Sequence, residues 1–460
     1  MKHYIAIDWG ATSGRVMVAH TDDSHKDGRT EMEEVHRFPN AIHRAEDGHF
    51  YWDFTGLMRE TMEGLRKAAA LGHHYESIGV DTWGVDVVFF DGEGRMLSEP
   101  VAYRDPYTEG IPEEFFERMP ADELYRRCGI QVLNFNTVFQ LYACHKERFA
   151  PLEQAKHVLF IPDAVSYLLS GRMVCEYSAL STAAMMDPRT KEIDGEVLRV
   201  CGMSRDLFPE IVFPGEDLGP ILPVVATETG LNSDCRVVAV AGHDTGSAVA
   251  ACPRVINGRR AAYLSCGTWS LMGIVTDEPV ISDESCRLNF TNEGGVNGST
   301  RLLKNITGMW VLEQCRKEWA AEGKEYSYTE LVTMAQAAKG KAEFIFNPDE
   351  PRFANPASML NEIQNGRVMT DQEIIWAIYN SMAHRYGEVF RMLQRLAPWS
   401  IEVLYVIGGG VRNAYLLQLT EQAIGVPVVV GPSEATAIGN ILVQNGAAGS
   451  EGGSVVQYAK

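Results

Sequence analysis

A single carboxylate stands at the end of the first apolar run of the chain, directly before a glycine-containing turn. Asp8 follows the apolar residues 4–7, and the turn Gly10–Gly14 leads to Arg15 and a second apolar run over 16–19. Glycine lets the backbone come close enough to aim N–H groups at an anion, and a carboxylate beside it could hold a hydrated Mg²⁺. The stretch predicts a phosphate-and-magnesium site, although an ordinary hairpin with a solvated Asp8 fits the same residues.

A second isolated aspartate, Asp244, follows another apolar run. Residues 237–241 lead through Gly242 and His243 to Asp244, and small residues typical of a helix come next. Ligands gather at such strand-to-helix junctions in open α/β sheets. A partly desolvated carboxylate there could accept a proton from a hydroxyl that attacks phosphorus. Taken alone, the run fits Asp244 as the cap of the helix better than as a base, and His243 fits a hydrogen-bonding neighbour better than a base.

Several classes of function are disfavoured by the sequence. It holds no G-x-x-x-x-G-K-[ST], no H-E-x-x-H and no G-x-S-x-G, the patterns of P-loop NTPases, zinc metalloproteases and α/β-hydrolases. The formal net charge of −20 disfavours nucleic acid and an anionic membrane as partners. A nucleotide would therefore need local positive charge from Mg²⁺, Arg15 or helix N-termini.

The cysteines and the hydropathy pattern predict a cytoplasmic protein. No basic-then-apolar leader precedes Asp8, and no apolar run reaches about 18 residues, the length needed to span a bilayer. The nine cysteines form no C-x-x-C pair, as expected for reduced thiols. They are Cys128, Cys144, Cys175, Cys201, Cys235, Cys252, Cys266, Cys286 and Cys315.

Elements that could position these residues alternate along the chain. Short β-rich runs end in glycine or a polar residue at 77–81, 237–241, 261–265, 404–407 and 427–430. Helical patterns lie between them, the clearest over 374–393 with Asp371 as its expected N-cap. Strands alternating with helices predict an α/β fold, and 460 residues predict more than one domain.

The pattern of the hairpin predicted over 5–19 is repeated at 263–275. Both consist of an apolar strand, a turn of small and polar residues and a second apolar strand, and both turns contain Gly and Thr. Two copies of one lobe would account for this similarity and would place the two turns across a cleft. We expect an N-terminal lobe over 1–238 and a C-terminal lobe over 239–460.

Together these motifs resemble the FGGY family of carbohydrate kinases, which has two actin-like, RNase H-type lobes around a central cleft. The resemblance extends from Ile5 to about Asn440. Each run alone is weak, but their number and order are specific. The runs that carry it are 6–15, 79–86, 101–105, 135–137, 243–245, 261–273, 291–295 and 303–306.

The resemblance implies roles for individual residues. Asp244 would be the general base, and Asp8 would organise Mg²⁺ through water. The sugar would contact Gly84, His243, Asp244 and Thr245 in the N-terminal part of the site, with Trp83, Asp86 and Arg104 lining the same pocket. ATP would bind the two turns and the adenosine side of the C-terminal lobe, at Ala11, Thr12, Ser13, Gly14, Arg15, Thr268, Asn305 and the glycines Gly408, Gly409 and Gly410.

The implied activity is ATP-dependent phosphorylation of a ketose at its 1-hydroxyl. The resemblance implies L-rhamnulose as this ketose, which would give L-rhamnulose 1-phosphate in L-rhamnose catabolism. L-Fuculose or D-xylulose as the sugar, an actin-like ATPase without a sugar acceptor, and an inactive sugar sensor are the alternatives. ATP, Mg²⁺ and a small ketose are the expected partners, and the enzyme would be a monomer or a small homo-oligomer.

Two positions depart from the pattern that this resemblance implies. Glu313 stands where the most similar members carry Gln near the nucleotide, and a carboxylate there could rearrange one adenosine contact. The family also continues further beyond a segment such as 434–440 than this sequence does. The second departure bears on the last packing layer rather than on the site.

Overall fold

Two compact units make up the protein. The structure is a computed structural model that describes residues 1–22, 29–340, 343–354, 356–446 and 456–458. The first unit combines Met1–Pro253, Val275–Leu302 and Ala435–Lys460, and the second combines Arg254–Ile274 and Leu303–Glu434. Each unit is thus assembled from separated parts of the chain. The expected lobes 1–238 and 239–460 stay a prediction.

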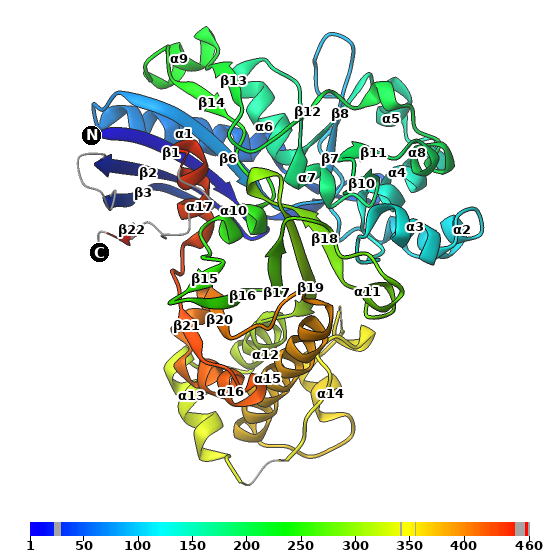
Figure 1. The fold of residues 1–460 in the computed structure, drawn as a ribbon, viewed down its shortest axis with the longest axis vertical. Helices are drawn as coiled ribbons and strands as arrows, with labels where there is room; N and C mark the ends of the chain where they lie inside the picture. Colours follow the sequence, from blue (N-terminus) through cyan, green and yellow to red (C-terminus); the bar gives the residue numbers. More distant parts are fainter. Residues whose placement is uncertain (23–28, 341–342, 355, 447–455, 459–460) are drawn as a thin grey trace. The chain divides into compact units, whose positions relative to one another are not determined.

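A seven-stranded sheet forms the centre of the first unit (Figure 1). Its strand β1 pairs antiparallel with β2 and parallel with β6, and β6 pairs parallel with β14. In sheet order the strands are β13 (Asp217–Pro220), β14 (Arg236–Val238), β6 (Tyr75–Thr82), β1 (Lys2–Trp9), β2 (Ser13–Asp22), β3 (Arg29–Pro39) and β22 (Val456–Tyr458).

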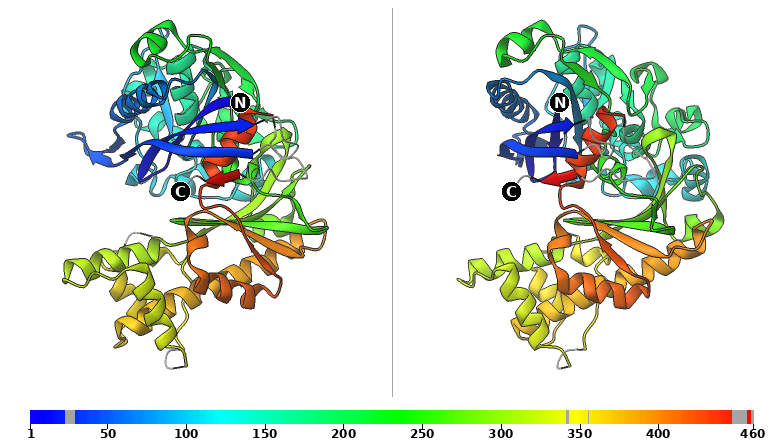
Figure 2. Two further views of the ribbon diagram at one scale, coloured as in Figure 1. Left: turned by 90° about the vertical axis from the view of Figure 1, so that its left-hand side faces the viewer. Right: turned by 60° about the vertical axis from the view of Figure 1, so that its left-hand side comes forward.

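Helices cover both faces of this sheet. Alternate residues of a strand face opposite sides, so Ile5 and Ile7 of β1 pack in one core with helix α1 (Phe54–Ala70), whereas Ala6 packs in another with helix α17 (Ala435–Gln444). Figure 2 shows α1 in blue and α17 in red on the two sides of the strands. Burial on both faces explains the nearly continuous apolar run of β1.

A glycine lets helix α17 approach helix α10 (Asp244–Ala250) closely. A Cβ atom built on Gly439 would lie 1.7 Å from the carbonyl oxygen of Ser247. No larger residue fits at position 439 unless one of the helices moves. The place of α10, and hence of Asp244 at its start, is therefore tied to α17.

The rest of the first unit consists of short elements around this sheet. They are the strands β4 (Ile42–Arg44), β5 (Phe50–Trp52), β7 (Val87–Phe90), β8 (His157–Phe160), β9 (Cys175–Glu176), β10 (Met186–Asp187), β11 (Glu192–Ile193) and β12 (Ile211–Val212). The helices are α2 (Ile111–Phe116), α3 (Ala121–Cys128), α4 (Thr137–Lys146), α5 (Ala150–Gln154), α6 (Ile161–Ser170), α7 (Tyr177–Ser181), α8 (Gly195–Cys201), α9 (Pro223–Thr229) and α11 (Asp283–Arg287).

A second sheet repeats the strand pattern of the first. Strand β16 pairs antiparallel with β17 and parallel with β20, and β20 pairs parallel with β21. In sheet order the strands are β18 (Thr291–Gly294), β19 (Thr300–Thr307), β17 (Trp269–Thr276), β16 (Arg259–Cys266), β20 (Val403–Ile407) and β21 (Val428–Val430), with β15 (Val255–Ile256) beside β16.

The longest helix, α15 (Asp371–Leu396), belongs to the second unit. Its N-cap is Thr370 rather than the expected Asp371, because the Thr370 hydroxyl accepts from the N–H of Glu373 while the Glu373 carboxylate accepts from the N–H of Thr370. This reciprocal capping box satisfies two N–H groups of the helix end. The other helices of this unit are α12 (Trp310–Ala321), α13 (Tyr328–Ala337), α14 (Met359–Gln364) and α16 (Ala414–Ile424).

The α/β fold class is confirmed, and so is the predicted similarity of the two hairpins. The hairpins β1–β2 and β16–β17 are both antiparallel and are both flanked by a parallel strand. None of the described helices combines the length and hydropathy that crossing a bilayer requires.

Candidate active site

Three neighbouring parallel strands of the first sheet bring aspartates to one edge. In the β1–β6 register Asp8 lies directly beside Asp81, and Thr82 bridges to His243, the residue before Asp244. The carboxyl ends of parallel strands meet at the same edge, where ligands of α/β sheets bind. The structure therefore places Asp8 and Asp244, predicted from separate runs of the sequence, at one edge of one sheet.

Asp8 is held by the residue opposite it in the β1–β2 hairpin. Its Oδ2 accepts from Arg15 Nε at 2.9 Å and from Arg15 Nη2 at 2.7 Å, and both side chains are mostly buried. The antiparallel register pairs the two residues. A charge-assisted contact of this kind fixes the carboxylate and offsets its charge.

Asp81 lies in the run 79–86, in which the sequence predicts no role for this position, and the structure places it at the same edge as Asp8. Its side chain is fully buried. Oδ2 accepts from Asn440 Nδ2 at 2.6 Å, whereas Oδ1 has no hydrogen-bond partner among the described residues. Burial raises the pKa of Asp81 well above its usual range, and the neighbouring charge of Asp8 raises it further. A buried carboxylate oxygen without a donor is suited to a cation or to a proton.

The donor set at this edge fits Mg²⁺. The ion prefers carboxylate oxygens and keeps several of its waters, and Asp8 and Asp81 offer carboxylates side by side. The unpartnered Oδ1 of Asp81 is the oxygen that a bound cation or one of its waters would satisfy.

Asp244 is the first residue of helix α10 and not its cap. The N-cap position is His243, whose side chain makes no capping bond. The Asp244 Oδ1 accepts from the backbone N–H of Thr245 at 2.5 Å and from its hydroxyl at 3.1 Å. About a third of the side chain, 32%, is exposed. Burial of the rest raises the pKa of Asp244, the positive charge of His243 lowers it, and the charge of Asp8 raises it again.

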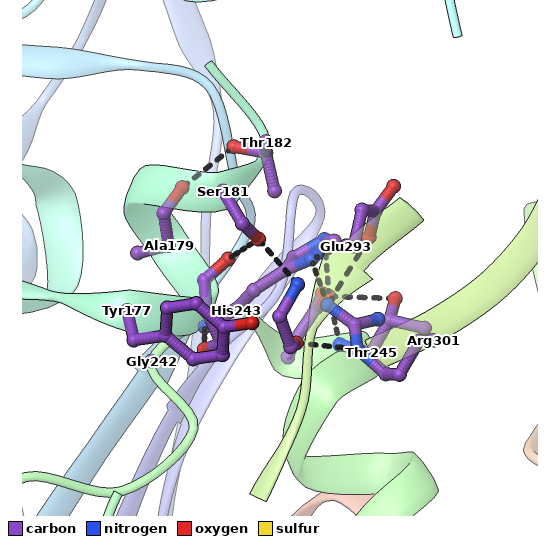
Figure 3. A network of polar contacts seen from close by, with 12 residues as sticks. Tyr177, Ala179, Ser181, Thr182, Gly242, His243, Thr245, Glu293 and Arg301 are labelled. Atoms are coloured by element: carbon purple, nitrogen blue, oxygen red, sulfur yellow. Dashed lines mark hydrogen bonds and ion pairs between the residues drawn. The ribbon is translucent and has the colours of Figure 1, made fainter. Parts of the chain in front are cut away.

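A buried ion network stands behind Asp244 (Figure 3). His243 Nε2 lies 3.5 Å from Asp244 Oδ1, and His243 Nδ1 lies 3.3 Å from Glu293 Oε2. Arg301 Nη2 lies 3.1 Å from that oxygen and 3.3 Å from His243 Nδ1. Burial would raise the pKa of Glu293, but the charges of Arg301 and His243 outweigh it and lower the pKa. Glu293 is thus a carboxylate.

Arg301 and the backbone before Asp244 are anchored independently. Arg301 has no exposed surface, and its Nε donates to the carbonyl of Gly294 at 2.8 Å. The N–H of Gly242 donates to Glu176 Oε2 at 2.9 Å, and the N–H of His243 donates to Ser178 Oγ at 3.2 Å. Since Glu176 is buried, these contacts hold the turn that carries Asp244 from below.

The predicted sugar loop at residues 83–86 lies against His243. A Cβ on Gly84 would come within 3.3 Å of the His243 ring and 3.2 Å of Thr182. Val85 has a φ of 70°, a region that β-branched residues rarely occupy. Its backbone is held on both sides, because its N–H donates to Thr182 and its carbonyl accepts from Thr137. Backbone strain that the surroundings enforce is common at functional sites.

Asp86 is the polar centre beneath this loop. Its Oδ2 accepts from the indoles of Trp52 at 2.7 Å and Trp83 at 2.9 Å, and its Oδ1 accepts from Gln140 at 3.0 Å. Burial raises the pKa of Asp86 to about 6 against the effect of these donors. Trp83 is itself buried, with its ring 4.3 Å from that of Trp52, and the guanidinium of Arg104 lies 5.2 Å from the ring of Tyr103.

In the second unit, glycines occupy the corresponding strand ends. The turn after β16 is closed by a bond from the N–H of Gly267 to the carbonyl of Trp269 at 2.9 Å. Gly408, at the end of β20, has a φ of 84°. A Cβ on Gly410 would lie 2.2 Å from the Cys266 sulfur, whereas one on Gly409 would meet nothing within 4 Å. The predicted ATP residues Thr268, Gly409 and Gly410 thus lie at two adjacent strand ends.

Comparison with known proteins identifies the family. The chain matches the N-terminal domain of the FGGY family of carbohydrate kinases over residues 3–251 and the C-terminal domain over residues 262–448. The chain belongs to the FGGY family of carbohydrate kinases. It is therefore a sugar kinase, a phosphotransferase that uses ATP as co-substrate.

Curated relatives and solved structures agree with this assignment. The chain is 48% identical to the rhamnulokinase of Bacteroides thetaiotaomicron over 96% of this chain and 90% of the relative. It is 38% identical to that of Enterococcus faecalis, over 96% and 89%. The fold is similar to a xylulose kinase from Lactobacillus acidophilus (TM-score 0.80, 15% identity, 97% and 89% covered). It is also similar to Plasmodium falciparum glycerol kinase with ADP (TM-score 0.75, 14% identity, 96% and 89% covered).

The predicted site residues divide into two groups, and each group lies within one unit. Asp8, Arg15, Gly84, His243, Asp244 and Thr245 belong to the first unit, together with the turn Ala11, Thr12, Ser13 and Gly14. Thr268, Asn305 and Gly408–Gly410 belong to the second. Asn305 lies on β19 and is half-buried. Glu313, on α12, accepts from Tyr328 at 2.7 Å and from Arg316 at 3.0 Å.

Proposed function

We propose that this kinase transfers the γ-phosphoryl group of ATP to the 1-hydroxyl of L-rhamnulose and produces L-rhamnulose 1-phosphate. Four curated relatives named rhamnulokinase are 36–48% identical over 96% of the chain, and they support this sugar over L-fuculose or D-xylulose. The structural observation that carries the chemistry is the meeting of Asp244 with Asp8 and Asp81 at one sheet edge.

Asp244 is the proposed general base. Its raised pKa makes its carboxylate a better proton acceptor than that of an ordinary aspartate. In the transfer, the bond from the sugar O1 to the γ-phosphorus forms, the bond from that phosphorus to the β–γ bridging oxygen breaks, and the hydroxyl proton passes to Asp244. ADP leaves with the bridging oxygen.

Asp8 and Asp81 are the residues proposed to hold Mg²⁺, with Asp8 acting through water. When bound, the ion would neutralise charge on the phosphoryl oxygens. Arg15 fixes the Asp8 carboxylate, and Asn440 fixes that of Asp81. Both carboxylates are therefore preorganised, which lowers the cost of arranging the site during transfer.

The remaining ligand contacts are also proposals. Gly84, His243 and Thr245 would contact the sugar, since the loop at Gly84 and the turn at His243 adjoin one another. The turn Ala11–Arg15, together with Thr268, Asn305, Gly409 and Gly410, would bind ATP. Open space beside Gly409 supports a close approach of its backbone to the nucleotide.

A panel of sugars tests the proposed function. ADP release by the full chain is measured with L-rhamnulose, L-fuculose, D-xylulose, L-ribulose, glycerol and no sugar. We expect the highest kcat/KM with L-rhamnulose. A higher kcat/KM with another sugar would refute the proposed substrate, and ADP release at the same rate without any sugar would favour the actin-like ATPase.

We further infer a cytoplasmic enzyme that acts as a monomer or a small homo-oligomer. All nine cysteines are free, and seven of them are buried, which suits a reducing compartment. Light scattering of the purified chain measures the number of subunits.

A further inference from the structure

Three histidines gather where strands β1 and β2 meet the turn that precedes β6. His3 and His20 are direct partners in the antiparallel β1–β2 register, and their Nδ1 atoms lie 2.7 Å apart. The His73 ring stacks on the His3 ring at 4.2 Å and lies edge-on to His20 at 5.0 Å. One ring nitrogen from each of the three lies within 4.8 Å of the other two.

This trio has the chemical features of a metal site. Each of the three imidazoles offers a ring nitrogen whose lone pair can bind a metal. His20 Nε2 faces Glu33 Oε1 at 3.5 Å. A carboxylate behind a histidine ligand orients the ring and raises its basicity.

We propose that His3, His20 and His73 bind a transition-metal dication of the zinc class. Imidazole ligands suit Zn²⁺, Cu²⁺ and Ni²⁺ and disfavour Mg²⁺ and Ca²⁺. Zinc–nitrogen bonds are about 2.0–2.1 Å long, so binding would require the three side chains to rotate toward one ion, and His3 and His73 would leave their stacked arrangement. The ion would tie the start of β1 and the end of β2 to the turn before β6.

Calorimetric titration of the full chain with Zn²⁺, at a fixed excess of Mg²⁺, tests the site. We expect one Zn²⁺ per chain at the trio, and we expect His73→Ala to weaken its binding by about 100-fold, as loss of one of three ligands to a metal does. His73 is exposed, so this variant should fold. The matched control is His74→Ala, which removes the adjacent exposed residue that faces Asp234 and should change the affinity by less than about threefold.

A thermal melt supplies a second readout. Zn²⁺ should raise the melting temperature of the parent chain and of His74→Ala, but not that of His73→Ala, because a ligand stabilises only the fold that binds it. Equal Zn²⁺ affinity and equal thermal shifts in the parent and His73→Ala would overturn the proposal. So would a lack of Zn²⁺ binding by the parent.

A separate observation concerns the ion network behind Asp244, and the inference from it rests on the proposed function. His243 is held at Nδ1 by the buried Glu293–Arg301 pair and presents Nε2 to Asp244. Burying two opposite charges costs free energy unless their mutual geometry compensates for the lost hydration. Arg301 is nevertheless fully buried, and its Nη1 has no hydrogen-bond partner among the described residues.

We infer that Glu293 and Arg301 are positioning residues for catalysis: they hold the imidazole of His243 in the orientation that places Nε2 beside the Asp244 carboxylate. Glu293 comes from β18 and Arg301 from β19, so neither adjoins Asp244 in the chain. His243 is the residue that lies between this pair and the Asp244 carboxylate.

A double-mutant cycle tests this route. Glu293→Gln keeps the size of the side chain and removes its charge, and we expect kcat to fall by about 10–100-fold with the KM for ATP unchanged. In a His243→Asn background the same change should lower kcat by less than about twofold, because the intermediary is already lost. Glu278→Gln, an exposed carboxylate ahead of the same strands, is the control and should match the parent.

The two possible failures are distinct. If the parent chain phosphorylates no sugar, the proposed function fails. If the parent is active but Glu293→Gln lowers kcat equally with and without His243, or does not lower it, the positioning role fails. Unchanged melting temperatures in the active variants separate a catalytic effect from unfolding.

Discussion

The two sheets share one strand pattern but end their strands in different residues. In each, a central strand pairs with an antiparallel hairpin partner on one side and with two successive parallel strands on the other. At the carboxyl ends of its parallel strands the first sheet carries Asp8, Asp81 and Asp244. The second sheet carries Thr268 and Gly408–Gly410 at the corresponding strand ends. The topology supplies a place for a ligand, and the residue type at each strand end decides the chemistry.

The two edges also differ in how their residues are packed. At the first edge, burial of Asp81 raises the pKa of that carboxyl, and the neighbouring charge of Asp8 raises it further, which favours binding of a proton or a cation. At the second edge the backbone itself is brought close, because a side chain at Gly410 would collide with Cys266. The first edge is thus defined by buried carboxylates, and the second by glycines.

The largest effect is expected from replacing Asp244, the proposed general base at the first edge. Asp244→Asn should lower kcat by about 10²–10⁴-fold, because the amide accepts no proton, and should leave the affinity for sugar nearly unchanged. Coupled ADP-release kinetics give kcat, and equilibrium titration with sugar gives the affinity. A variant with normal turnover would remove Asp244 from the role of base.

The next largest effect is expected from replacing Asp8, which is proposed to hold Mg²⁺ at the same edge. Asp8→Ala should raise the Mg²⁺ concentration required for half-maximal activity by about 10-fold or more, or abolish transfer, since an aligned carboxylate is lost. Rates measured across a Mg²⁺ series at saturating ATP and sugar test this. An unchanged Mg²⁺ dependence would contradict the position assigned to Asp8.

The second edge can be tested with two adjacent glycines. Gly410→Ala should lower the free energy of unfolding by about 1–3 kcal/mol, because its Cβ would overlap the Cys266 sulfur. Gly409→Ala has open space and should fold like the parent while raising the KM for ATP. Denaturant melts and ATP titrations distinguish the two, and equal stability of both variants would contradict the steric reading.

The smallest effect concerns the pH dependence of stability around Asp86. Its pKa of about 6 lies above the value of an unfolded aspartate, so the folded state binds the extra proton between about pH 4 and pH 6. Stability from this group is greatest below that interval, falls as pH rises through it, and is constant above. Asp86→Asn should flatten the slope there by up to about 1.4 kcal/mol per pH unit, measured by denaturant melts at several pH values.

Sequence reasoning succeeded where one short run marks the end of a strand. Apolar runs that end in Asp8 and Asp244 predicted two strand ends, and the repeated hairpin predicted the second sheet. Asp81 received no role because its importance comes from the β1–β6 register, which sets it beside Asp8. An apolar run ending in aspartate, the pattern already used for Asp8, is a signal that could have found it.

Other contacts could not be predicted from any local sequence pattern. Glu293 and Arg301 meet His243 only through the packing of distant strands, and the three histidines at 3, 20 and 73 are separated by whole elements. Thr370 rather than Asp371 caps α15, because both residue types suit that position and only the backbone decides between them.

The glycine contact between α17 and α10 makes the active centre vulnerable at a distance. Random mutagenesis of this kinase should recover loss-of-function clones at Gly439, 195 positions beyond the aspartate that they disable. Because the atom in conflict is the backbone carbonyl oxygen of Ser247, a smaller side chain on α10 would not relieve it, and revertants should restore glycine at position 439.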